Sequence, residues 1–251
     1  MKLGIVGKGG VGKTTTSSLI IEAYARQGKR VVAIDTDSNP NLGVSLGLTL
    51  DETEAIPVLP RAMIVGAGGD ADRLLADYGR ATPSGATLLS AIRVTEAGGG
   101  CTCSGHATVR SLLGAVLDEQ ADVTLVDMEA GLEHLSRSGG TLAHADILLV
   151  IMEPSRKSVI TAARTVALAE ELGIPHTYAV GNKARLPEDA EFFADRCAEH
   201  GVPLAGIVPY DPEVVDADRS GLSLGAGRAE PVREAVDKIV AFLDGIMAPA
   251  H

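Results

Sequence analysis

The chain has 251 residues, of which 45% are hydrophobic, and a formal net charge of −11. This length is sufficient for one large α/β domain with a buried core. The acidic balance argues against a nucleic acid partner bound through the general surface. The sequence lacks a long uninterrupted apolar run and a signal region, so we expect a cytoplasmic protein that does not bind a membrane.

Short β-branched apolar runs alternate along the chain with longer helical patterns, which is typical of a parallel sheet with crossover helices. The runs predict strands at 2–6, 30–35, 122–127, 145–152, 177–182 and 204–209, and the longer patterns predict helices at 14–27, 109–119, 157–172, 188–199 and 231–246. The strands are almost continuously apolar, as strands covered on both faces should be. The sequence therefore predicts an α/β fold in a single domain over 1–251, with a mostly parallel central sheet flanked by helices on both faces. A Gly-rich segment at about 51–105 is either a floppy insertion or a functional excursion.

The first loop, GKGGVGKTT, fits two phosphate-binding patterns. Gly7, Gly9 and Gly12 satisfy the dinucleotide turn, whereas Gly7, Gly12, Lys13 and Thr14 satisfy the P-loop pattern. A dinucleotide turn requires only the glycines and the helix N-terminus, not the ammonium and hydroxyl groups that follow. A nucleoside triphosphate requires both groups, since Lys13 would neutralise the β- and γ-phosphates and Thr14 would bind Mg²⁺. The backbone N–H groups at the start of the following helix would cradle the phosphates, from Gly9, Gly10, Val11, Gly12, Lys13, Thr14 and Thr15.

Acidic residues follow two of the predicted strands. Asp35 and Asp37 lie in DTDSNP after the second strand, where a carboxylate can orient a water molecule or a Mg²⁺-bound water. Asp127 begins DMEAG at the end of the third strand and is expected to hold Mg²⁺ through its water shell. Gly131 in the same motif would let the chain turn when a γ-phosphate is present.

The stretch GGGCTCSGH places Cys101 and Cys103 at most about 7 Å apart along the chain, so both thiolates can reach one metal ion. A closed thiolate site usually has four ligands, and a second copy of the chain in a two-fold dimer would complete the set. The alternative is two unremarkable thiols. His106 is a candidate auxiliary ligand. His134 is expected to hydrogen-bond locally, and Cys197 to be a small core residue or a chance surface thiol.

The segment KGGVGKTT resembles the deviant P-loop of the ATPase class that includes MinD, ParA, the nitrogenase iron protein and arsenite-pump ATPases. This resemblance implies that Lys8 reaches across a dimer interface to the partner's phosphates, and that Asp37 activates the attacking water. The loops GNKA and VPYD look like the adenine-contacting loops of the class, with contacts from Asn182, Pro209 and Tyr210. An ordinary strand-end Asn and a turn Pro remain the alternative.

The motifs of the chain resemble those of the CooC family in kind and in order. They are the deviant P-loop, the DxD at 35–37, the C-x-C at 101–103, the segment at 127–135 and IVPY at 207–210. This resemblance implies an ATP-dependent homodimer that binds Ni²⁺, or Zn²⁺, between subunits and inserts nickel into carbon monoxide dehydrogenase. Glu129 departs from the family, which usually has Gly at this position. The alternatives are a MinD/ParA-like positioning ATPase and an iron–sulfur electron-transfer ATPase. The acidic C-terminal tail disfavours the first, and the lack of cysteine at 128–132 disfavours the second.

Overall fold

The computed structural model describes residues 1–37, 41–60, 71–92, 109, 120–128 and 142–248. Several predictions lie outside these residues. They are the helix at 109–119 beyond its first residue, the cysteine pair Cys101 and Cys103, and the individual residues His106, Glu129, Gly131 and His134.

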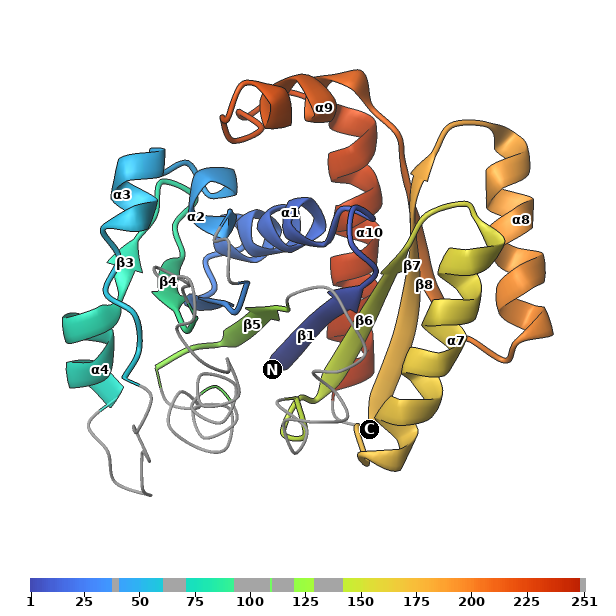
Figure 1. Cartoon of the computed structure of the whole chain (residues 1–251), viewed down its shortest axis with the longest axis horizontal. Helices are drawn as coiled ribbons and strands as arrows, with labels where there is room; N and C mark the ends of the chain where they lie inside the picture. Colours follow the sequence, from blue (N-terminus) through green and yellow to red (C-terminus); the bar gives the residue numbers. More distant parts are fainter. Residues whose placement is uncertain (38–40, 61–70, 93–108, 110–119, 129–141, 249–251) are drawn as a thin grey trace, which may run out of the picture.

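The described strands form one eight-stranded sheet in the order β3-β4-β2-β5-β1-β6-β7-β8 (Figure 1). The strands are β1 (Lys2–Gly7), β2 (Val31–Asp35), β3 (Arg80–Ala81), β4 (Thr87–Ser90), β5 (Val123–Asp127), β6 (Ile147–Met152), β7 (His176–Ala184) and β8 (Leu204–Pro209). All neighbours are parallel except β3 and β4, which pair antiparallel at the edge. The predicted α/β class with a mostly parallel sheet is confirmed.

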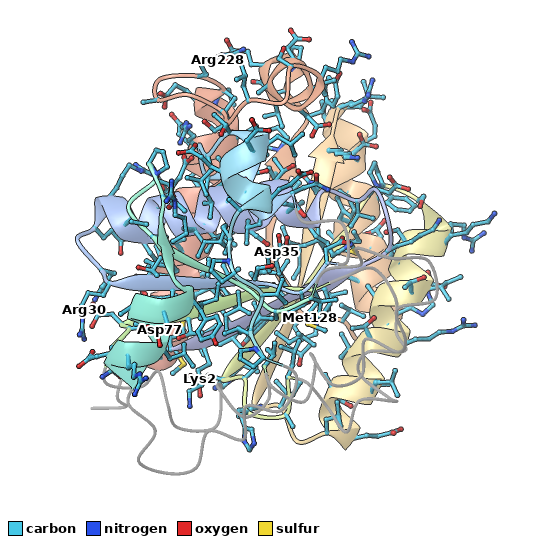
Figure 2. All side chains as sticks on the ribbon, turned by 60° about the vertical axis from the view of Figure 1, so that its left-hand side comes forward. Lys2, Arg30, Asp35, Asp77, Met128 and Arg228 are labelled. Atoms are coloured by element: carbon cyan, nitrogen blue, oxygen red, sulfur yellow. The ribbon has the colours of Figure 1, made fainter. Side chains whose placement is uncertain are left out.

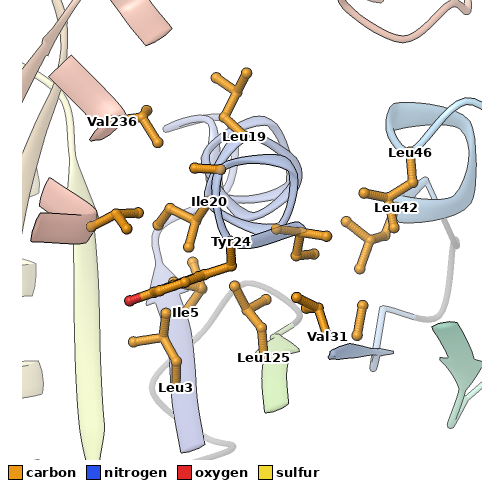
Figure 3. Close-up of a cluster of buried hydrophobic side chains, with 14 of the residues drawn as sticks. Leu3, Ile5, Leu19, Ile20, Tyr24, Val31, Leu42, Leu46, Leu125 and Val236 are labelled. Atoms are coloured by element: carbon orange, nitrogen blue, oxygen red, sulfur yellow. The ribbon is translucent and has the colours of Figure 1, made fainter. Parts of the chain in front are cut away.

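Helices cover both faces of the sheet (Figure 1). One face carries α1 (Lys13–Arg26), α2 (Leu42–Ser45), α9 (Pro212–Arg219) and α10 (Glu230–Met247), and the other carries α4 (Ala71–Tyr78), α7 (Arg156–Glu171) and α8 (Pro187–Glu199). Alternate residues of a strand pack against the helices on opposite faces of the sheet, because successive side chains of a strand point to opposite faces. Leu3 and Ile5 pack with α1 (Figure 3). Val6 packs in the cluster on the opposite face.

Part of the segment at 51–105 belongs to the sheet. Its described residues form most of α3 (Leu50–Glu54), the helix α4, and the strands β3 and β4. β4 pairs in parallel with β2, with Ser90 opposite Asp35. The sequence did not predict this strand, because TLLS is a four-residue run among small and glycine residues. The described part of the segment therefore includes a sheet edge, and the choice between a floppy insertion and a functional excursion stays open for the rest.

The C-terminal helix α10 packs on the sheet through a continuous apolar face, formed by Val232, Val236, Ile239, Val240 and Leu243. Its Arg233 makes a largely buried ion pair with Glu22 of α1, with 2.8 Å between Nη1 and Oε2. On the other face of the sheet, Cys197 of α8 is buried in the core. Of the two predictions for this residue, the core residue is confirmed and the surface thiol is not. In the described part of the chain, no helix has the length and apolar character needed to cross a bilayer.

Candidate nucleotide-binding site

The candidate site lies where the carboxyl ends of β1, β2 and β5 meet. The neighbours of β1 are β5 and β6, which come later in the chain, so the strand order reverses around β1. Open α/β sheets bind ligands outside the carboxyl ends of the strands at such a point. Asp35 and Asp127 end two of the strands and lie directly opposite each other in the register of β2 and β5. Figure 2 shows Asp35 in the middle of the molecule, above Met128.

The P-loop, residues 7–15, has a backbone conformation at three positions that only glycine adopts easily. Gly7, Gly10 and Gly12 have φ values of 152°, 81° and 93°. A Cβ atom on Gly7 would lie 2.5 Å from the carbonyl oxygen of Ile151, and one on Gly12 would collide with Asn182. The loop leads directly into α1 at Lys13, which places the positive end of the helix dipole at the loop. This geometry suits an anion.

The two lysines of the loop differ in exposure. Lys13 is buried, and its Nζ lies 3.4 Å from the carbonyl oxygen of Lys8, inside the loop. Burial raises the pKa of Asp127 and the Lys13 charge opposes this rise, so the two side chains are electrostatic neighbours. Lys8 is exposed. The buried lysine can therefore serve a phosphate bound in its own loop, while the exposed lysine is accessible from outside the chain.

Asp127 is a buried carboxylate held by hydroxyl groups of α1. Ser17 Oγ donates to Asp127 Oδ1 at 2.9 Å. Burial raises the pKa of Asp127 to about 6, although hydrogen bonds from Thr14 and Ser17 and the charge of Lys13 oppose this shift. The structure thus places Thr14 and Asp127 together, and their oxygens are the ligand type that Mg²⁺ prefers.

Asp35 and Asp37 have different environments. Asp35 is buried, and its two carboxylate oxygens accept the backbone N–H groups of Asp37 at 3.0 Å and Leu42 at 3.2 Å. Burial, followed by repulsion from Asp127, raises the pKa of Asp35 to about 8. Asp37 is half-buried. Asp35 therefore anchors the turn that carries Asp37, and the role of Asp37 at the attacking water stays a prediction.

The residues predicted to contact adenine lie at the ends of β7 and β8. Asn182 is buried, and its Nδ2 donates to the carbonyl oxygen of Val11 at 2.8 Å. Pro209 and Tyr210 are half-buried, and the Tyr210 N–H donates to the Ala184 carbonyl at 2.7 Å. The adenine contacts stay a prediction. The structure adds a second role for Asn182, because its amide supports the P-loop.

The structure brings in three residues that were not predicted from the sequence. Ser17 binds Asp127, and its spacing of three residues from Thr14 on one helix face was the available signal. Thr36 Oγ1 donates to the Asp127 carbonyl at 2.9 Å and ties the ends of β2 and β5 together. Lys183 Nζ donates to the Gly10 carbonyl at 2.5 Å. Lys183 lies in the GNKA loop that the sequence singles out, but no local pattern reveals its contact or that of Thr36, since each depends on how distant strands are arranged.

No cluster of three or more His, Cys, Asp or Glu side chains that could hold a metal ion is found within the described residues. The predicted thiolate ligands lie outside these residues.

The site combines a glycine loop between a central strand and its helix, a buried lysine, and carboxylates at the ends of the neighbouring strands. This combination defines an α/β protein that binds a nucleoside triphosphate. The family described as "CobQ/CobB/MinD/ParA nucleotide binding domain" matches residues 5–224, and the chain belongs to this family. It is thus a nucleotide-binding ATPase of the MinD/ParA type. This confirms the predicted ATPase class.

Two curated relatives cover most of the chain. The carbon monoxide dehydrogenase accessory protein CooC of Rhodospirillum rubrum is 35% identical over 239 residues, which are 89% of this chain and 89% of that protein. An uncharacterized ATP-binding protein of Methanocaldococcus jannaschii is 33% identical over 257 residues, covering 96% of this chain and 98% of its own. The resemblance to the CooC family is confirmed at the level of sequence similarity.

Solved structures show the same fold. The MinD cell division protein of Aquifex aeolicus matches with a TM-score of 0.71 at 23% identity, covering 100% of this chain and 99% of that one. The septum site-determining protein MinD of Pyrococcus horikoshii, complexed with Mg-ADP, matches with a TM-score of 0.73 at 18% identity, covering 99% of both chains. At these identities the likeness establishes the fold.

Proposed function

We propose that this ATPase is a metallochaperone that binds nickel at a Cys-x-Cys site shared by two copies of the chain and inserts it into carbon monoxide dehydrogenase. The observation that carries the proposal is the 35% identity, over 89% of both chains, with a carbon monoxide dehydrogenase accessory protein. The pair Cys101 and Cys103 adds a donor set that suits a soft metal ion.

In this proposal the P-loop holds ATP and Mg²⁺ as its substrate complex. Lys13 neutralises the β- and γ-phosphates, and the N–H groups of the loop bind the phosphate oxygens. Thr14 and Asp127 hold Mg²⁺, whose charge stabilises the leaving phosphates. The hydrogen bonds and electrostatic coupling that connect these side chains support this assignment. Asp37 orients the attacking water, which is supported by its position on the turn that Asp35 anchors.

Lys8 is proposed to act on the partner's phosphates in a homodimer. Its exposure supports a role outside its own loop. A cation brought to the transferred phosphoryl group from a second chain stabilises charge in the way that an arginine finger does. ATP would therefore favour the dimer.

Nickel binding would favour the same dimer, because each chain supplies two thiolates and four are complete only when two chains meet. Zn²⁺ accepts the same donors. Two ligands that stabilise one state strengthen each other's binding by linkage. Hydrolysis would remove the ATP contribution, weaken the dimer and open the thiolate site, which gives a physical route for release of nickel to its client.

The decisive experiment measures metal stoichiometry and association state together. Nickel is titrated into the protein, with and without Mg-ATP, while the molar mass is followed by analytical ultracentrifugation. We expect one ion per dimer, and we expect the variant C101A/C103A to lose dimerisation by nickel but to keep dimerisation by ATP. Cys197→Ala is the matched control, because this cysteine is buried in α8 and should leave the nickel response unchanged.

One nickel ion per monomer, with no effect on association, would contradict the shared site. The client step is checked by activation of nickel-free carbon monoxide dehydrogenase, which should require nickel and ATP hydrolysis together. Sedimentation of the protein with liposomes or DNA at physiological salt would instead favour a positioning ATPase. A stoichiometric 4Fe–4S absorption band after anaerobic purification would favour an electron-transfer ATPase.

A further inference from the structure

The end of β7 that meets the P-loop contains an irregularity at Asn182 and Lys183. The register of β7 on β8 shifts between Gly181 and Ala184, because β7 has one residue more than β8 between these pairs. Lys183 adopts a φ of 61°, in the left-handed region that non-glycine residues rarely occupy. Such a conformation is strained and persists only where the surrounding contacts hold it. Bulges next to functional sites commonly re-aim side chains.

The bulge directs two consecutive side chains onto the same loop. Asn182 Nδ2 donates to the carbonyl oxygen of Val11 at 2.8 Å, and Lys183 Nζ donates to the carbonyl oxygen of Gly10 at 2.5 Å. Consecutive residues of a regular strand would point to opposite faces of the sheet. The strained residue is therefore what allows both contacts to form.

These contacts fix the orientation of two peptide groups of the P-loop. In a trans peptide the C=O of one residue and the N–H of the next point in opposite directions. When β7 holds the carbonyls of Gly10 and Val11, the N–H groups of Val11 and Gly12 are turned away from β7. The Val11 N–H accordingly donates to the Lys8 carbonyl, with 3.4 Å between N and O, and Lys13 Nζ approaches the same oxygen. The Val11 N–H thus points to the side of the loop on which Lys13, the proposed counter-charge of the phosphates, lies.

We propose that the Asn182–Lys183 bulge is a clamp on the P-loop, and that Lys183 is a positioning residue for the phosphates of the nucleotide. Its ammonium holds the Gly10 carbonyl outward and so keeps the loop donors preorganised. The proposal rests on nucleotide binding at the P-loop and is independent of nickel delivery.

The test uses three substitutions at Lys183 in the full chain, because Asn182 is also a candidate adenine contact. Lys183→Gly and Lys183→Asn tolerate the left-handed conformation but lose the cation, and Lys183→Arg keeps a cationic donor. We expect Mg-ADP and Mg-ATP to bind about tenfold more weakly to the Gly and Asn variants, because the loop donors are no longer preorganised and must be ordered when the nucleotide binds. Binding to the Arg variant should stay close to wild type. Titration calorimetry gives the affinities, and thermal unfolding without nucleotide gives Tm.

A purely structural role predicts that affinity and Tm fall together. The clamp predicts the opposite combination, in which Lys183→Gly has an unchanged or higher Tm because strain is relieved, while its nucleotide affinity falls. Lys29→Asn, in the exposed connection between α1 and β2, is the control for loss of one positive charge and should bind nucleotide as wild type does. Wild-type affinity in Lys183→Gly and Lys183→Asn, or equal weakening in Lys183→Arg, would overturn the clamp. Failure of the wild-type protein to bind nucleotide would instead contradict the proposed function.

Discussion

Replacement of Asp127 by Asn should stabilise the nucleotide-free protein at neutral pH. Burial raises the pKa of Asp127 from its ordinary value of 3.8 to about 6. Between about pH 4 and pH 6 the folded protein therefore binds the proton more readily than the unfolded chain does, and the wild type loses stability as the pH rises. One pKa unit corresponds to about 1.4 kcal/mol, so the full loss is about 3 kcal/mol.

The Asn variant has no such loss. Its free energy of unfolding, relative to wild type, should rise by about 1.4 kcal/mol per pH unit between about pH 4 and pH 6 and level off above. Removal of the Asp127 charge should also lower the pKa of Asp35, since repulsion between the two carboxylates raises it. ATP hydrolysis should fall at the same time, because the carboxylate that is proposed to hold Mg²⁺ is lost.

Urea unfolding of the magnesium-free protein at several pH values measures the difference. Asp122→Asn is the control of opposite sign, since hydrogen bonds from Arg30 lower the pKa of Asp122 at the surface, and its loss should not stabilise the protein at neutral pH. The reasoning is refuted if the stability difference between Asp127→Asn and wild type does not change with pH.

Three further substitutions test the site and the core. Lys13→Ala should reduce Mg-ATP binding and turnover by about 10²-fold or more, because the triphosphate loses a buried counter-charge, and wild-type turnover would contradict the P-loop assignment. Asp37→Ala should bind ATP normally in calorimetry but hydrolyse it about 10²-fold more slowly or worse, and loss of binding would show a structural or Mg²⁺-holding role instead. Arg233→Ala should lower the free energy of unfolding by about 3–5 kcal/mol in urea, because Glu22 and the carbonyls of Leu224 and Gly225 lose a largely buried partner; a loss under about 1 kcal/mol would show that water replaces it.

Local sequence signals were sufficient for the chemistry of the P-loop and for the class of the fold. The glycine spacing followed by Lys13 and Thr14 distinguishes a triphosphate loop from a dinucleotide turn, since each group has a separate task on the phosphates. Continuous apolar runs predicted strands buried on both faces, and the helices at 14–27 and 231–246 match α1 and α10 to within one residue. These features depend on neighbours in the sequence.

Tertiary structure decided which of these residues meet. The strand β4 was not predicted because its four residues carry little periodicity. Its pairing with β2 stabilises it as a strand, and that pairing is not visible in the local pattern. Asp35 and Asp127 are separated by most of the chain's first half, yet strand register places them opposite each other, while the carboxylate of Asp35 accepts N–H groups of the turn that follows β2. Lys183 contacts Gly10 only because β7 bulges beside the loop. Residue spacing along the chain sets the chemistry that a motif can perform. Strand order and strand register set the partners of each side chain, because order and register arise from contacts between distant segments.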